Sequence, residues 1–268
     1  MKVGIIGCGA IGTMVAQELA CSYAALELSA VYDRVPARAQ SLTENLNSPA
    51  KVVATLTRLF ELSELIVEAA SSNVVEQVLR LAITHDTNVL IMSTAGVLLH
   101  PDIIDTIREQ GHPNIYLPSG ALGGLDALSA ARLRELEYVM LTTSKPPQAL
   151  AGAPYVQEHG IDLCKLDKAT LIFEGPARQA IEAFPKNINV SATLSLAGIG
   201  LDKTYVRIIA DPGITRNTHH LRAKGRFGEM EATVRNVPSE GNPKTSYLAA
   251  LSALAVLRRM ADPIKTGT

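Results

Sequence analysis

Short apolar runs alternate with segments of helical periodicity along residues 1–120. The runs that have the length of buried strands are Lys2–Ile6, Glu27–Tyr32, Val52–Ala54, Leu65–Ala70, Asn88–Met92 and Ile115–Leu117. Helical spacing occurs between them, over Gly12–Cys21, Pro36–Leu46, a stretch ending near Leu62, and Val74–Thr84, whose expected buried face is Val74, Val78, Leu81 and Ala82. Strands that alternate with helices of this length predict right-handed crossovers and a parallel sheet.

The pattern changes after residue 120, where strand-like runs are more widely spaced. Strands are predicted at Tyr138–Thr143, Ala169–Phe173 and Thr204–Ala210, and helices at Pro176–Phe184 and Ile188–Ala197. The stretch Leu221–Asn236, interrupted by Gly225 and Gly228, has the pattern of a β-hairpin. We therefore expect residues 121–240 to form an α+β domain with an open mixed sheet.

The last part of the chain has a strong helical pattern. It covers Lys244–Met260 and follows a Gly-Asn-Pro sequence of the kind that starts helices. We expect residues 241–268 to pack back on the first domain, which makes that domain discontinuous in sequence.

A glycine-rich turn separates the first predicted strand from the first predicted helix. Gly7, Gly9 and Gly12 have the G-x-G-x-x-G spacing. In that spacing the glycines permit a tight turn, a close approach of the backbone to a pyrophosphate, and close packing of helix on strand. The start of the helix, with Ala10 and Ile11, offers N–H groups and the positive end of the helix dipole to phosphates.

An acidic residue ends the second predicted strand. Asp33 follows the last glycine by about 20 residues, where a carboxylate is able to accept both ribose hydroxyls of NAD. Arg34 comes next and is able to stack on adenine or to pair with the 2′-phosphate of NADP. These features together predict an α/β protein with an N-terminal Rossmann dinucleotide-binding domain over residues 1–120. NAD is the favoured cofactor, and use of NADP is the alternative.

Charge and cysteine content narrow the range of partners. Lysine and arginine together number 25 against 26 aspartates and glutamates, a balance that predicts no binding of nucleic acid or of an anionic membrane. The three cysteines are odd in number and lack metal-ligand spacing, so we expect free thiols in a reducing compartment and no metal site. No apolar run reaches the roughly 18 residues of a membrane span and no signal peptide is evident, so we expect a soluble, cytoplasmic protein.

The second domain must supply the substrate site, because a dinucleotide-binding fold provides only the hydride acceptor. Three of its stretches are unusually polar or rich in glycine: PSGALGGLDAL, FPKNINVSATLSLAG and ADPGITRNTHHLRAKGRFG. The last contains the adjacent His219 and His220. On a strand these two side chains face opposite ways, so at most one of them points into a site.

These stretches, together with GCGAIG, SSNVVEQV and IMSTAGVL, resemble motifs of the L-aspartate dehydrogenases, a family of NAD(P)-dependent amino-acid dehydrogenases of bacteria and archaea. The resemblance extends along nearly the whole chain, and the motifs of the second domain are much more specific than the glycine spacing. It implies oxidative deamination of L-aspartate to iminoaspartate and then to oxaloacetate and ammonia, in a role that feeds NAD biosynthesis. It also implies a homodimer.

The resemblance implies roles for individual residues as well. The family's catalytic histidine follows an Asn-x-His pattern, which here selects His219, and the contacts to the nicotinamide match Ala121 and Asn189. A second asparagine and a second histidine lie close by and leave a choice of neighbouring positions. We expect His219, with a pKa near the ordinary value of about 6.5, to exchange protons and to activate the water that attacks the imine.

The two carboxylates of aspartate need cations or backbone N–H donors. Lys186, Arg216 and Arg222 are candidates, although each is equally compatible with an ordinary solvated charge. Two other functions stay open. The HHLRAK run is similar to the His-His-x-x-x-Lys run of dihydrodipicolinate reductase, but GRFG stands where a Ser-Gly pair is expected. A non-enzymatic dinucleotide sensor would need an output module, for which the chain shows neither length nor a basic segment.

Overall fold

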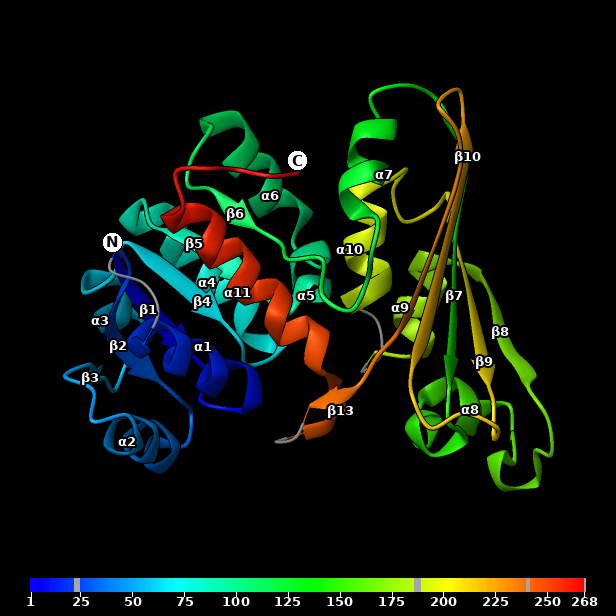
Figure 1. Ribbon diagram of the computed structural model, residues 1–268, viewed down its shortest axis with the longest axis horizontal. Helices are drawn as coiled ribbons and strands as arrows, with labels where there is room; N and C mark the ends of the chain where they lie inside the picture. Colours follow the sequence, from blue (N-terminus) through cyan, green and yellow to red (C-terminus); the bar gives the residue numbers. More distant parts are fainter. Residues whose placement is uncertain (22–24, 186–188, 240–241, 268) are drawn as a thin grey trace. The chain divides into compact units, whose positions relative to one another are not determined.

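The computed structural model describes residues 1–21, 25–185, 189–239 and 242–267, with only the backbone described for residues 242–244. The chain divides into two compact units, whose elements are labelled in Figure 1. Unit 1 consists of Met1–Pro118 and Ala249–Lys265, and unit 2 is built mainly from Ser119–Leu248. Ala249–Lys265 is therefore separated in sequence from the rest of unit 1.

A parallel six-stranded sheet forms the centre of unit 1. In spatial order its strands are β3 (Lys51–Val52), β2 (Glu27–Tyr32), β1 (Lys2–Ile6), β4 (Leu65–Glu68), β5 (Asn88–Ile91) and β6 (Ile115–Tyr116). The strand order reverses between β1 and β4, which is the point where open parallel sheets bind ligands at the carboxyl ends of their strands. The predicted parallel sheet is confirmed.

Helices connect these strands in the sequence of unit 1. They are α1 (Ala10–Cys21), α2 (Pro36–Asn45), α3 (Leu56–Glu61), α4 (Ser72–His85), α5 (Thr94–Leu98) and α6 (Pro101–Gln110). The expected buried face of α4 is partly wrong, because its buried residues are Val75, Val78, Leu79 and Ala82. These follow the i, i+3, i+4, i+7 spacing from Val75, which leaves Val74 and Leu81 at the margins of the stripe.

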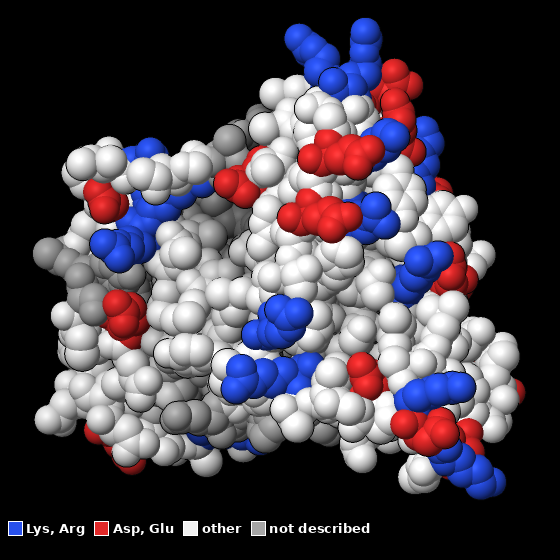
Figure 2. All heavy atoms as spheres, turned by 45° about the vertical axis from the view of Figure 1, so that its right-hand side comes forward, with Lys and Arg blue, Asp and Glu red and all other residues white. Residues whose placement is uncertain are grey.

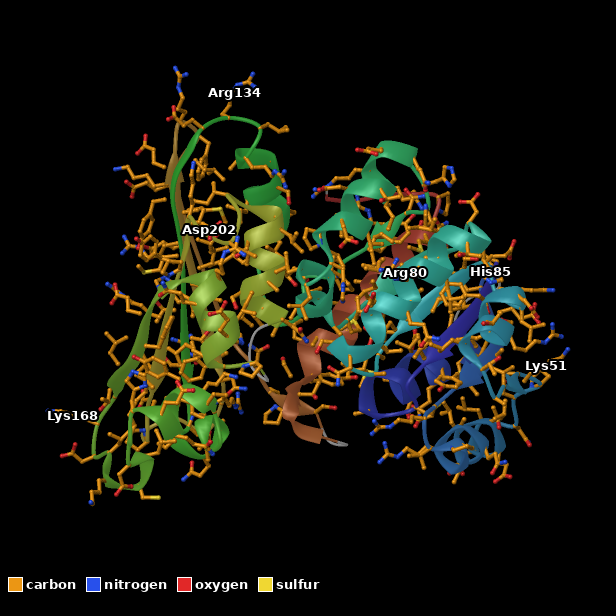
Figure 3. All side chains as sticks on the ribbon, turned by 180° about the vertical axis from the view of Figure 1, so that it is seen from behind. Lys51, Arg80, His85, Arg134, Lys168 and Asp202 are labelled. Atoms are coloured by element: carbon orange, nitrogen blue, oxygen red, sulfur yellow. The ribbon has the colours of Figure 1, made fainter. Side chains whose placement is uncertain are left out.

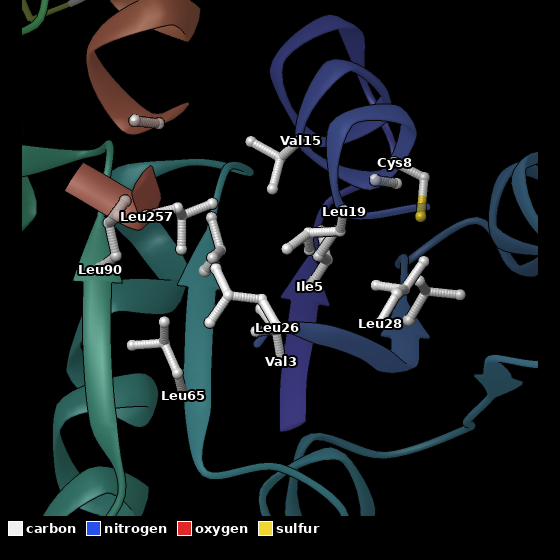
Figure 4. Packing of buried hydrophobic residues seen from close by; sticks show 14 of the residues in the cluster. Val3, Ile5, Cys8, Val15, Leu19, Leu26, Leu28, Leu65, Leu90 and Leu257 are labelled. Atoms are coloured by element: carbon white, nitrogen blue, oxygen red, sulfur yellow. The ribbon is translucent and has the colours of Figure 1, made fainter. Parts of the chain in front are cut away.

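The C-terminal helix α11 (Tyr247–Ala261) shares a hydrophobic cluster with the sheet of unit 1. Leu257 of α11 is fully buried in this cluster, as is Leu90 of β5 (Figure 4). The helix starts later than its pattern predicts. Asn242–Ser246 is strand β13 and pairs with β12 (Pro238–Ser239), so Asn242 and Pro243 lie in a strand instead of starting a helix.

Unit 2 contains a mixed five-stranded sheet, in agreement with the prediction. Its spatial order is β11 (Gly228–Arg235), β10 (Thr218–Gly225), β7 (Leu136–Lys145), β9 (Thr204–Ala210) and β8 (Thr170–Pro176). β7 and β9 are parallel, and the other neighbours are antiparallel. Arg134 and Lys168, just before β7 and β8, accordingly lie at opposite ends of the sheet (Figure 3). The hairpin starts at Thr218 instead of Leu221, so both adjacent histidines belong to a strand.

Helices cover one face of this sheet, which we call the inner face (Figure 1). They are α7 (Leu125–Ala131), α9 (Ala177–Ala183) and α10 (Asn189–Ala197); the short α8 (Pro154–Glu158), η1 (Pro147–Leu150) and η2 (Leu163–Lys165) lie between β7 and β8 in sequence. The opposite, outer face carries ion pairs such as Arg222 with Glu231 and Arg207 with Glu174. Figure 2 shows acidic and basic side chains next to one another on this unit. No helix among the described residues is long and apolar enough to cross a membrane.

Candidate functional site

The glycine turn of unit 1 has the geometry that a pyrophosphate requires. Gly7 has a φ of +94°, and a Cβ there would lie 2.7 Å from the carbonyl oxygen of Ala69. A Cβ on Gly12 would collide with the carbonyl oxygen of Gly7, so the third glycine allows helix α1 to pack against the turn. A Cβ on Gly9 would meet nothing within 4 Å, which leaves the backbone open to a ligand. Ala10 and Ile11 begin α1 at this place, so the residues present fit a dinucleotide phosphate.

Asp33 connects the glycine turn with the loop that follows β2. Its Oδ2 atom accepts a hydrogen bond from the N–H group of Cys8 at 2.8 Å, and its Oδ1 atom accepts one from Val35 at 2.8 Å. A carboxylate oxygen can accept more than one hydrogen bond, so both atoms keep capacity for ribose hydroxyls. Arg34, immediately after it, is exposed.

Glu68 is a buried carboxyl group that the sequence analysis did not single out. It ends β4, where Oε1 accepts hydrogen bonds from Ala70 N–H at 2.8 Å and from the Ser93 hydroxyl at 2.9 Å, and Oε2 accepts one from Ser93 N–H at 2.9 Å. Burial raises the pKa of Glu68 although these donors oppose the shift. The carboxyl group joins the loops after β4 and β5 at the carboxyl edge of the sheet. The sequence feature that could have drawn attention to Glu68 is its position as a charged residue at the end of an apolar run.

His219 lies on the inner face of the unit 2 sheet. It pairs across the strands with Thr143 of β7, and its Nδ1 atom is 3.0 Å from the Thr143 hydroxyl oxygen. The histidine is only 4% exposed. Burial lowers the pKa of His219 to about 3, and the positive charge of Lys145 contributes to this. The expectation of a pKa near 6.5 is therefore wrong for this structure, and the imidazole is neutral at physiological pH.

His220 occupies the opposite face of the same strand, as strand alternation predicts. Its Nε2 atom lies 3.5 Å from Oε2 of Glu231 on β11. Of the two neighbours, His219 is thus the histidine that shares a face with the buried polar groups of unit 2.

Lys145 is the second buried titratable group of this face. It follows Thr143 by one strand period, is 7% exposed, and has a pKa lowered to about 8 by burial. Together with Thr143 and Ser191 it supplies the polar part of the wall of a cavity of about 10 Å³, close to the space that one water molecule needs. The sequence analysis missed this lysine, although it continues the inward alternation of Val139, Leu141 and Thr143.

The residues expected near the nicotinamide lie in unit 2. Ala121 is buried, and its carbonyl oxygen accepts a hydrogen bond from Nδ2 of Asn236 at 3.3 Å. Asn236 in turn accepts one from the Ser246 hydroxyl at 2.5 Å, so a buried amide fixes the backbone at Ala121. Asn189 is the first residue of α10, and its carbonyl oxygen accepts from Thr193 Oγ1 at 2.8 Å. Contacts of Ala121 and Asn189 with a nicotinamide stay predictions.

The cations expected to bind carboxylates are differently placed. Arg222 is on the outer face, where its Nε atom is 2.7 Å from Oε1 of Glu231, so the structure does not bring it to His219. Arg216 is exposed in the loop before β10. Lys186 lies outside the described residues. Within the described part of the chain, no group of three or more histidine, cysteine, aspartate or glutamate side chains is placed to hold a metal ion.

Comparison with known proteins identifies relatives of both units. A model of the aspartate dehydrogenase C-terminal domain matches residues 126–260, and one of the homoserine dehydrogenase NAD-binding domain matches residues 7–118. The L-aspartate dehydrogenase of Methanocella arvoryzae is 44% identical over 270 residues, which cover 100% of this chain and 99% of the relative. That of Nitrosopumilus maritimus is 40% identical over 272 residues, with the same coverage of 100% and 99%.

Solved structures give the same result. The aspartate dehydrogenase of Thermotoga maritima has a TM-score of 0.74 at 28% sequence identity, with 100% of this chain and 99% of that chain covered. A myo-inositol dehydrogenase of Lactobacillus casei in complex with NAD(H) and myo-inositol has a TM-score of 0.57 at 17% identity, with 100% and 89% covered, and shows the fold alone. The glycine turn and the matched NAD-binding domain make a nicotinamide dinucleotide the cofactor. Because the C-terminal model matches half of the chain and the curated relatives are 40% and 44% identical over its full length, the protein belongs to the L-aspartate dehydrogenase family.

Proposed function

We propose that the protein catalyses the NAD(P)-dependent oxidative deamination of L-aspartate, the substrate in the names of its full-length relatives. Aspartate, water and the oxidised dinucleotide are converted to oxaloacetate, ammonium, the reduced dinucleotide and a proton. The observation that carries this proposal is the buried, neutral His219 beside a buried lysine in the unit that matches the aspartate dehydrogenase C-terminal model. Iminoaspartate formed in this way is able to feed NAD biosynthesis.

The bound nicotinamide ring supplies the acceptor for the hydride that leaves Cα of aspartate. The chain's own residues act on protons and water. If Nδ1–H of His219 donates to the Thr143 hydroxyl, Nε2 is left as the acceptor that takes a proton from the water attacking the imine carbon. Burial is the main reason why the pKa of His219 is lowered, and the positive charge of Lys145 is the second. An anionic substrate beside Lys145 offsets only this second contribution, which makes proton uptake by His219 easier in the bound state than in the free protein.

We propose NAD as the preferred cofactor, with NADP as a second one. The Asp33 carboxylate offers acceptors to ribose hydroxyls and repels a 2′-phosphate, whereas the exposed Arg34 is able to pair with that phosphate. Ala121, whose backbone is fixed by Asn236, and Asn189 are proposed to hold the nicotinamide amide.

We also propose that the chain works as a homodimer, joined through the outer face of the unit 2 sheet, in the cytoplasm. That face exposes Leu171 of β8 and Tyr205 of β9, which are 51% and 44% accessible in the single chain. Large apolar side chains exposed on a sheet face are typical of protein interfaces.

Steady-state kinetics with a panel of substrates test the proposed reaction. Reduction of NAD or NADP that depends on L-aspartate, together with the reverse reaction from oxaloacetate and ammonia, is the expected result. Turnover of dihydrodipicolinate instead would support a reductase, and cofactor binding without turnover of any substrate would support a sensor. Rates measured with each cofactor separately give the preference between NAD and NADP.

A further inference from the structure

The inner face of the unit 2 sheet holds a buried positively charged side chain, Lys145. Lys145 is the last residue of β7, and its inward neighbours Val139 and Leu141 are apolar. A lysine at such a position normally extends its ammonium group to solvent. Here the side chain is 7% exposed, and burying an ammonium group costs free energy of folding.

The surroundings of Lys145 have the chemistry of a small anion site. Thr143 and Ser191 line the same cavity, so its wall is polar next to Lys145, and Leu141, Leu150 and Ile208 supply the apolar part of the wall. Among the described lining residues and their strand neighbours, His219 is the other titratable group on this face, and its Nδ1 atom is already next to Thr143. An ammonium group beside an apolar wall, at a space of about one water molecule, matches one oxygen atom of a carboxylate.

The cations that the sequence suggested for carboxylate binding are less suitable. Arg222 is paired with Glu231 on the outer face, and Arg216 is exposed in the loop before β10. Only the inward position of Lys145 places a described cation on the same face as His219.

We propose that Lys145 binds a carboxylate of the dicarboxylic substrate beside His219 and thereby selects for acidic amino acids. This inference rests on the proposed function for the identity of the substrate, but it predicts carboxylate binding by unit 2 whether or not turnover occurs. The lowered pKa of Lys145, about 8, agrees with a buried cation that gains stabilisation when an anion arrives. The positive charge that acts on His219 is offset by the same event.

The test compares Lys145→Met with Lys224→Met. The first variant removes the charge and keeps most of the side-chain volume, and the second removes a lysine that pairs with Glu229 at the exposed end of the same sheet. Binding of succinate to each protein saturated with NADH is measured by calorimetry, and the KM for L-aspartate by kinetics. Loss of one charge-assisted contact predicts about 10- to 100-fold weaker binding for Lys145→Met and little change for Lys224→Met.

Further measurements distinguish the possible outcomes. Equal succinate affinity in the wild type and Lys145→Met, or an equal loss in both variants, overturns the inference. If kcat/KM falls for L-aspartate but not for L-asparagine, Lys145 binds the side-chain carboxylate; if both fall, it binds the α-carboxylate.

Succinate binding that depends on Lys145 without any turnover of aspartate would retain the inference and reject the proposed function. Should Lys145→Met fail to fold, Lys145→Gln keeps a polar group in the polar part of the cavity for the same comparison.

Discussion

The Nδ1 atom of His219 lies 3.0 Å from the hydroxyl oxygen of Thr143, its direct cross-strand partner. Because the two residues sit opposite each other on neighbouring strands, the sheet itself fixes the orientation of the imidazole ring. The direction of this hydrogen bond is linked to the tautomer: where Nδ1–H donates to the hydroxyl oxygen, Nε2 carries no proton and is able to accept one. Thr143 is therefore a positioning residue in the proposed mechanism, and its effect should be on the rate more than on substrate affinity.

Thr143→Val removes the hydroxyl group and keeps the shape of the side chain. We expect kcat to fall about 10- to 100-fold, because a loosely oriented base reaches the productive geometry less often, while KM for L-aspartate changes less. Thr143→Ser, which restores a hydroxyl, should recover most of the rate. A higher KM for L-aspartate with an unchanged kcat would show that Thr143 does not position the histidine.

His219→Ala should lower kcat by about 10²–10⁴-fold, the usual effect of removing a general acid or base. Binding of NAD, measured by fluorescence, should persist because the glycine turn belongs to unit 1. His220→Ala should keep most of the rate, since that side chain faces Glu231 on the outer face. If His220→Ala abolishes turnover and His219→Ala does not, the assignment of the two neighbours is reversed.

The burial of His219 also determines how kcat/KM of the wild type should depend on pH. The kcat/KM profile reports groups of the free enzyme, where the pKa of His219 is lowered to about 3. We therefore expect no limb from His219 near its ordinary pKa of about 6.5 in kcat/KM. A limb there that disappears in His219→Ala would contradict the described environment of the imidazole.

Much of the fold could be predicted because it depends on local patterns. The alternation of apolar runs and helices predicted the parallel sheet of unit 1, and the glycine spacing predicted its ligand-binding turn. The adjacent histidines were harder to place, since two polar residues in sequence resemble a loop. They form a strand because β10 finds partners on both sides, with Thr142 and Thr143 opposite the histidines on β7.

The electrostatic properties of the site could not be predicted from the sequence. The pKa of His219 depends on burial beneath elements far away along the chain and on the charge of Lys145. Glu68 and Lys145 were overlooked for a related reason, because a single charge in an apolar stretch indicates function only when its side chain is known to be buried. The three cations that were considered instead came from polar stretches, where charges are normally solvated.

The dimer proposal predicts a mass of about twice the 28.6 kDa of the chain in light scattering. Replacing Leu171 by Asp should weaken association, because it places an uncompensated charge in the proposed apolar contact on the outer face. Leu133→Asp, which changes another strongly exposed leucine just before β7, serves as the matched control. A wild-type mass that stays near 28.6 kDa at all concentrations would contradict the dimer.

Asp33→Ala should weaken the binding of NAD more than that of NADP, because the carboxylate is proposed to accept the ribose hydroxyls. The same change removes acceptors from the N–H groups of Cys8 and Val35, so some loss is expected for both cofactors. Asp33→Asn keeps one acceptor oxygen and reduces that shared loss. Dissociation constants for both dinucleotides decide the matter, and equal losses would place ribose recognition elsewhere.

The buried charge of Lys145 should make the stability of the protein depend on pH in the alkaline range. The pKa of Lys145 is about 8 in the folded chain, against an ordinary value of 10.5 in the unfolded chain. Between these values the unfolded chain holds more protons, so the contribution of this group to the free energy of unfolding rises with pH.

Lys145→Met should consequently be more stable than the wild type near neutral pH, by up to about 3 kcal/mol, although it binds substrate more weakly. The difference should shrink as the pH is raised from about 8 towards 10.5, where the wild-type lysine loses its charge in both states. Urea denaturation at several pH values measures this difference, with Lys224→Met expected to show no such trend because its charge is exposed. A Lys145→Met variant that is less stable than the wild type at neutral pH would mean that the folded chain stabilises the ammonium group. In that case the charge of Lys145 does not lower the free energy of unfolding, and its burial is no argument for substrate binding.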